Sequence, residues 1–114
     1  MMTNIYDTAN QLEREVRELE QFKALEEAFN QLKENEESFK VFKAFQDLQV
    51  RLQEKQMTGQ DVTEDDAKQM QELFTKVQQD DAINALFEKE QALSQIMNEI
   101  TAMMMKPVQD LYGF

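Results

Sequence analysis

The feature that most constrains this chain is the recurrence of apolar residues at every third or fourth position along most of its length. That spacing places apolar side chains on one face of an α-helix. Only two glycines and one proline occur among the 114 residues, so little interrupts the pattern. The sequence predicts an all-α fold, an antiparallel helical bundle of about four to five helices with a long C-terminal helix, completed by dimerisation. Because the length is typical of one domain, we expect a single helical domain over residues 1–114.

The N-terminal half divides where the apolar stripe loses its phase. A first helix begins near Asn4 or Asp7, either of which can cap it, and its stripe fades around residues 18–21. Either a second short helix or a continuation of the first with a bend then follows. Asn35 is placed to cap the next helix, which runs to about Gln56. The three stripes consist of Ile5, Ala9, Leu12, Val16 and Leu19, then Phe22, Leu25, Ala28, Phe29 and Leu32, and then Phe39, Phe42, Phe45, Leu48 and Leu52.

A glycine turn and a threonine cap separate the third helix from the fourth. Gly59 suits the left-handed residue that follows a helix end. Thr63 comes next as an N-cap with acidic residues in the first turn, and we expect Val62 to pack against Ala67 as a hydrophobic staple. The fourth helix should therefore cover about residues 64–79, with a stripe made of Ala67, Met70, Phe74 and Val77.

The last helix has the most regular pattern in the chain. Asp80 or Asp81 can cap it, and apolar residues keep near-heptad spacing over residues 83–104. Pro107 lacks a backbone donor and clashes with the preceding turn, so we expect a kink or a stop there. Three apolar residues beyond the proline should pack as a tail: Val108, Leu111 and Tyr112.

Composition excludes several classes of function. The chain has no cysteine and no histidine, which removes thiolate metal sites, iron–sulfur ligation, cysteine nucleophiles and the commonest general base. No phosphate-binding glycine loop is present, so we expect no enzyme and no cofactor. The formal net charge of −11 disfavours direct contact with nucleic acid or an anionic membrane. With no signal peptide and no stretch of roughly 20 apolar residues, a cytoplasmic location is the default expectation.

One acidic cluster, made of Asp61, Glu64, Asp65 and Asp66, allows two interpretations. Carboxylates are the ligands that Mg²⁺ and Ca²⁺ prefer, although the order here does not match a calcium-binding loop. Acidic residues are also common in the first turn of a helix, where they stabilise its positive end. We favour the capping role and expect no metal site.

The last helix also contains the candidate contact surface between copies. Glu90 falls on its apolar stripe, where it lies either at the edge of the contact, near a basic residue of another helix, or inside it as a device that fixes partner or register. The run Met103-Met104-Met105 either fills a core or forms an adaptable interface. The predicted interface residues are Leu86, Glu90, Leu93, Met97, Ile100, Met103 and Met104.

Four segments together resemble a known family. These are residues 4–15 (NIYDTANQLERE), residues 39–46 (FKVFKAFQ), residues 88–100 (EKEQALSQIMNEI) and residues 105–112 (MKPVQDLY). In this order they are similar to the YheA branch of the YlbF/YmcA family, small helical proteins of Gram-positive bacteria. The resemblance implies an all-α fold in which long antiparallel helices pair between chains, as a dimer or a higher oligomer.

The resemblance also implies a regulatory setting without a catalytic residue. YlbF and YmcA act with YaaT as accessory factors of the endoribonuclease RNase Y, in complexes associated with cysteine-ligated iron–sulfur clusters. This chain has no cysteine, so that cluster does not carry over. We expect a cytoplasmic, non-enzymatic, homo-oligomeric interaction protein with an adaptor or regulatory role, whose partners are its own copies and possible regulatory relatives. The alternative is an accessory factor of RNA processing that acts through an endoribonuclease such as RNase Y.

Overall fold

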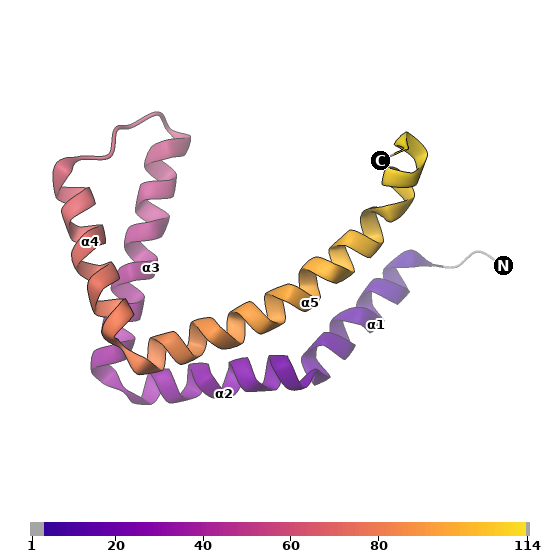
Figure 1. Ribbon diagram of the computed structural model, residues 1–114, viewed down its shortest axis with the longest axis horizontal. Helices are drawn as coiled ribbons and strands as arrows, with labels where there is room; N and C mark the ends of the chain where they lie inside the picture. Colours follow the sequence, from indigo (N-terminus) through magenta and orange to yellow (C-terminus); the bar gives the residue numbers. More distant parts are fainter. Residues whose placement is uncertain (1–3, 114) are drawn as a thin grey trace. The chain divides into compact units, whose positions relative to one another are not determined.

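The computed structural model describes residues 4–113, and within them every regular element is an α-helix. The five helices are α1 (Ile5–Glu18), α2 (Glu20–Glu34), α3 (Glu36–Met57), α4 (Glu64–Gln79) and α5 (Asp81–Tyr112) (Figure 1). The predicted all-α fold with a long C-terminal helix is therefore confirmed. The dimer that the sequence predicts to complete it remains a prediction.

Capping side chains set most of the helix boundaries where the sequence predicts them. Asn4 accepts a hydrogen bond from the Tyr6 N–H at 3.0 Å and begins α1, and Asn35 accepts one from the Ser38 N–H at 3.2 Å and begins α3. Leu19 has an extended backbone, so α1 and α2 are two helices rather than one with a bend. These side chains satisfy backbone donors that a helix start leaves free.

The sequence allows a kink or a stop at Pro107, and the structure excludes the stop, because Pro107 lies inside α5 and the helix continues to Tyr112. A proline removes one helical hydrogen bond and displaces the preceding turn, but its own φ is compatible with a helix. The yellow C-terminal turns of α5 leave the axis of the orange part (Figure 1), which agrees with the predicted kink.

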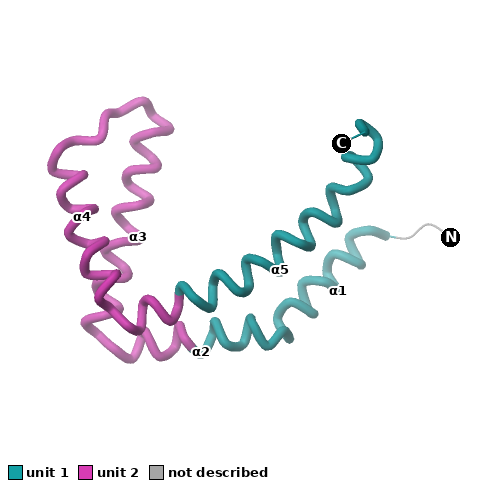
Figure 2. Tube along the Cα trace, in the orientation of Figure 1, with its two compact units in different colours: residues 1–27, 87–114 teal, residues 28–86 magenta. Residues whose placement is uncertain are grey.

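The chain divides into two compact units, and each is described by itself (Figure 2). Unit 1 comprises residues 1–27 and 87–114, and unit 2 comprises residues 28–86. The division falls within α2 and within α5, so each of these helices contributes to both units.

Unit 2 contains every buried residue among those described. Its core is built on the antiparallel pair α3 and α4 together with the adjoining ends of α2 and α5, and Leu32, Ile83 and Leu86 are its most completely buried large side chains. Phe29 meets Phe39 and Phe42 edge to face, with ring centroids 6.4 and 6.3 Å apart. The remaining core side chains are Ala28, Phe42, Phe45, Leu48 and Val77.

A polar contact connects α3 with α4 at each end of the pair. Next to the connecting loop, the Lys55 ammonium forms an ion pair with the Asp66 carboxylate. At the other end, the Ser38 hydroxyl donates a hydrogen bond to Asp80, whose carboxylate also accepts from the Ile83 N–H and begins α5. The two contacts join residues 11 and 42 positions apart, and each connects α3 with the start or the end of α4, so they fix α3 and α4 against each other.

The predicted stripe of α4 is only partly buried. Val77 lies in the core, but Phe74 is 49% exposed, because α4 packs on one helix rather than inside a closed bundle. Val62 and Ala67 are both exposed, so the expected staple contributes no burial at the start of α4. No helix in the described part of the chain is long and apolar enough to serve as a membrane-spanning segment.

Candidate interaction surface

Unit 1 is an antiparallel pair of amphipathic helices with an open apolar side. α1 runs alongside the C-terminal part of α5 (Figure 2), and an apolar hollow of about 350 Å³ lies between them. Its apolar lining comes from α1, the start of α2 and α5: Ala9, Leu12, Val16, Phe22 and Met97. None of the residues described in this unit is buried, although their spacing marks one apolar face on each helix.

The most exposed apolar residues of unit 1 gather toward the C-terminal end of α5 and the beginning of α1. We call five of them the α5 apolar end: Met103, Met104, Met105, Val108 and Leu111, which are 69, 61, 47, 44 and 80% exposed. Ile5 and Tyr6, at the start of α1, are also more than 70% exposed. Val108, Leu111 and Tyr112, which the sequence predicts to pack as a tail, are 44, 80 and 70% exposed, so they are not part of a core within the chain.

Helix geometry makes the α5 apolar end one continuous surface. Met104, Val108 and Leu111 continue the four-and-three spacing of the α5 stripe past Pro107. Met103 and Met105 lie about 100° to either side of Met104 and so widen the stripe. Monomeric proteins rarely expose contiguous apolar patches larger than about a few hundred Å², and such patches usually mark an interaction site.

The structure separates the predicted interface residues into three groups. Leu86 lies in the core of unit 2 and is 1% exposed. Leu93 and Ile100 are half-buried on the stripe of α5, and Met97, Met103 and Met104 are exposed on the same helix. Glu90 is exposed in the single chain.

A salt bridge borders the apolar hollow on α1. The Arg17 guanidinium lies 2.9 Å from the Glu13 carboxylate, one helical turn away, and both side chains are more than half exposed. The hydrogen bond from Arg17 lowers the pKa of Glu13 below its ordinary value, and the positive charge of Arg17 adds to this. The pair keeps a charged, solvated rim beside the apolar lining, which is the usual arrangement at the edge of a contact surface.

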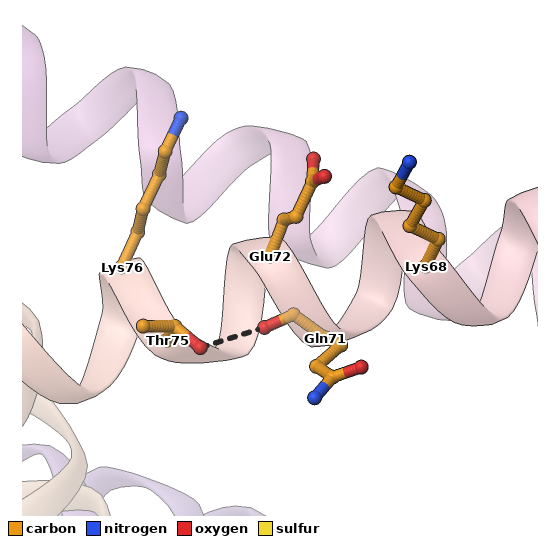
Figure 3. A pocket seen from close by; sticks show the side chains of 5 residues that line it. All are labelled: Lys68, Gln71, Glu72, Thr75 and Lys76. Carbon is orange, nitrogen blue, oxygen red and sulfur yellow. Dashed lines mark hydrogen bonds between the residues drawn. The ribbon is translucent and has the colours of Figure 1, made fainter.

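A second hollow, on the outer face of α4, is less suited to binding. Figure 3 shows Lys68, Glu72 and Lys76 projecting side by side, and the Thr75 hydroxyl donating to the Gln71 carbonyl at 2.9 Å. Opposite charges one helical turn apart stabilise an exposed helix without any bound ligand. This face is therefore solvated helix surface.

One residue of the acidic cluster, Asp66, takes part in capping α4, and Glu64 and Asp65 lie in the first turn of the helix. Thr63 and Asp66 form a reciprocal capping box: the Asp66 N–H donates to the Thr63 hydroxyl at 3.1 Å, and the Thr63 N–H donates to the Asp66 carboxylate at 3.2 Å. No group of three or more acidic residues within positions 4–113 could hold a metal ion. The partnership of Asp66 with Lys55 could not be predicted, because it depends on how the loop between α3 and α4 closes.

Comparisons with known proteins agree on one family. A family model described as control of competence regulator ComK, YlbF/YmcA, matches residues 5–109. A UPF0342 protein of Lactiplantibacillus plantarum is 45% identical over 98% of each chain, and one of Staphylococcus aureus strain JH9 is 43% identical over 99% of each.

Solved structures give the same result for the fold. A protein of unknown function (DUF964) from Bacillus stearothermophilus superposes with a TM-score of 0.84 at 31% identity, covering 95% of each chain. The yheA protein of Bacillus subtilis superposes with a TM-score of 0.75 at 29% identity, covering 96% of this chain and 100% of that one. The resemblance drawn from the four sequence segments is thus confirmed.

Proposed function

The chain belongs to the YlbF/YmcA family, and we propose that it is a non-enzymatic homo-oligomeric interaction protein whose copies associate through the apolar side of unit 1. The observation that carries this proposal is the contrast between the two units. Unit 2 has its own core, whereas unit 1 has apolar stripes on two helices and no buried residue among those described.

The energetic argument favours a second copy as the occupant of this surface. Each Å² of apolar surface that is buried contributes about 25 cal/mol. The total free energy gained by burying several hundred Å² is therefore comparable with the net stability of a chain this short. Both α1 and α5 present stripes with similar spacing, so two copies related by a twofold axis can cover each other's exposed side chains. The copies carry a net charge of −11 each, so a broad apolar contact is needed to offset their repulsion.

Matched variants test where the association occurs. Leu111→Asp places a charge in the α5 apolar end, and Met57→Asp places one on an exposed methionine of unit 2. Light scattering at micromolar concentration should give at least twice the mass of one chain for the wild type and for Met57→Asp. Leu111→Asp should give a smaller average mass. A folded wild-type chain that stays monomeric under these conditions would overturn the proposal.

The adaptor role concerns a second contact, made by the assembled oligomer. We propose that its acidic outer surface, together with any apolar side chains left uncovered, binds another regulatory protein in the cytoplasm. Cross-linking in the native cell followed by purification should recover a defined partner with the wild type. If repeated captures recover only copies of this chain, the adaptor role is wrong and self-association stands.

The family match favours one further candidate, an accessory role in RNA processing through an endoribonuclease such as RNase Y. The negative net charge disfavours direct binding of this chain to RNA, so the nuclease would have to bind the RNA. Deletion of the gene should then change the ends of specific transcripts. Unchanged transcript ends in the deletion strain would remove this candidate.

A further inference from the structure

The sulfur chemistry of this chain is concentrated on α5. The chain has eight methionines and no cysteine, so thioethers are its only oxidisable sulfur groups. Within α5, Met97, Met103, Met104 and Met105 are 41, 69, 61 and 47% exposed. The last three are consecutive, and they belong to the α5 apolar end that the proposed function places in the contact between copies.

We propose that Met103, Met104 and Met105 form a modification site at which a peroxide reversibly weakens self-association. This inference rests on the proposed function and adds its regulation. The ligand class is a small hydroperoxide, for which hydrogen peroxide is the simplest probe.

The chemical step is a two-electron oxygen transfer to sulfur. A lone pair of the thioether attacks one oxygen of hydrogen peroxide, the S–O bond forms, and the O–O bond breaks. The departing hydroxide takes up the proton left on the transferred oxygen and leaves as water. The sulfur is oxidised to the sulfoxide and the peroxide is reduced, so no other reactant is needed; a thiol-dependent sulfoxide reductase restores the thioether.

Because of where the three methionines lie, their oxidation should weaken the contact between copies. A second copy laid along the stripe contacts Met104 at its centre, and Met103 and Met105 lie about 100° to either side, at the edges of that contact. Each sulfoxide adds a strongly polar S–O group that the apolar contact leaves without a donor. Oxidation at this site should raise the dissociation constant of the oligomer by about tenfold or more.

Self-association in turn should protect the site from oxidation. Contact with a second copy covers these thioethers, so their oxidation rate should fall as protein concentration rises. Met57 provides an internal control, since it is 81% exposed at the end of α3 and belongs to unit 2 rather than to the α5 apolar end. Its rate should not change with concentration.

The experiment combines peptide mass spectrometry with sedimentation equilibrium on the full chain. Wild-type protein is measured before treatment, after treatment with hydrogen peroxide, and after enzymatic reduction of the sulfoxides. We expect dissociation after oxidation and recovery after reduction. The variant Met103→Leu/Met104→Leu/Met105→Leu conserves side-chain volume and should stay associated after the same treatment, while Met57→Leu should respond as the wild type does.

The outcomes separate this inference from the proposed function. A wild type that is monomeric before treatment overturns both. A wild type that self-associates, acquires all three sulfoxides and keeps the same dissociation constant overturns the modification site alone. If the triple leucine variant does not fold, the oxidised and re-reduced wild-type samples still decide the question.

Discussion

At the scale of single residues, the Asp66 side chain stabilises the start of its own helix and also contacts the preceding helix. Its carboxylate accepts from the Thr63 N–H in the capping box and pairs with Lys55 of the preceding helix. Chiefly the hydrogen bond from Lys55, and next that from the Thr63 backbone, hold the pKa of Asp66 below its ordinary value. The ionised form is therefore the one that stabilises the α3–α4 connection.

This lowered pKa predicts a stability that depends on pH. The unfolded chain binds a proton at Asp66 more readily than the folded chain does, so the contribution is present in full above about pH 5 and is lost as pH falls through and below about 4. Asp66→Asn should therefore flatten the acid side of the stability profile, as measured by urea unfolding between pH 7 and pH 3.

Asp65→Asn is the matched control, since it removes a charge from the neighbouring exposed position in the same helical turn. Asp65→Asn should change the free energy of unfolding at acid pH less than Asp66→Asn does. Equal slopes for the two variants would show that the contact with Lys55 does not contribute to acid stability.

A second residue-scale prediction concerns the core of unit 2. Leu32 is fully buried, and Leu32→Ala should lower the free energy of unfolding by about 2–5 kcal/mol through lost burial and the cavity left behind. Val50→Ala, at a position 54% exposed on α3, should change it by about 0.5 kcal/mol or less. Chemical denaturation at one fixed protein concentration measures both; a small effect at Leu32 would contradict the assigned core.

At the scale of elements, the helix boundaries could largely be predicted because their causes are local. Asn4, Asn35 and Thr63 cap the helices that the apolar periodicity outlines, and Gly59 has the positive φ of 76° that a helix end followed by a turn requires. The contact between Ser38 and Asp80 could not be predicted, because it joins residues 42 positions apart and depends on how α3 and α4 pack.

Pro107 shows where a local rule could not decide between a kink and a stop. The rule counts the lost hydrogen bond and the clash, but the helix on both sides of the proline keeps its apolar spacing and its remaining hydrogen bonds. A proline near the end of a long helix therefore bends it without ending it.

Replacing this proline tests that interpretation. Pro107→Ala restores a backbone donor and should stabilise the last turns of α5 by roughly 1–3 kcal/mol, seen as slower amide hydrogen exchange in residues 103–112. Gln109→Ala, at an exposed neighbouring position outside the α5 apolar end, is the control and should leave exchange within about 0.5 kcal/mol of the wild type. Unchanged exchange in Pro107→Ala would mean that the proline does not limit the order of these turns.

At the scale of the whole molecule, the periodicity predicted which faces are apolar but not which of them find partners within the chain. The stripe residues Leu48 of α3 and Val77 of α4 are buried in unit 2, whereas Leu12 and Val16 of α1 remain only half-buried despite equally regular spacing. The spacing of apolar residues shows which face of a helix is apolar. Which other element covers that face depends on tertiary packing. The sequence already placed Met103 and Met104 in the predicted interface, but only the packing shows that Leu86 belongs to the core of unit 2 and that Val108 and Leu111 are exposed.

The most direct test of the central claim, that a second copy completes unit 1, is hydrogen exchange of the wild-type chain at several protein concentrations. Amides of α1 (Ile5–Glu18) should gain protection by about tenfold or more as concentration rises from nanomolar to tens of micromolar, while amides around Phe42 and Leu48 of unit 2 should change little. Protection in α1 that is the same at every concentration would contradict the claim.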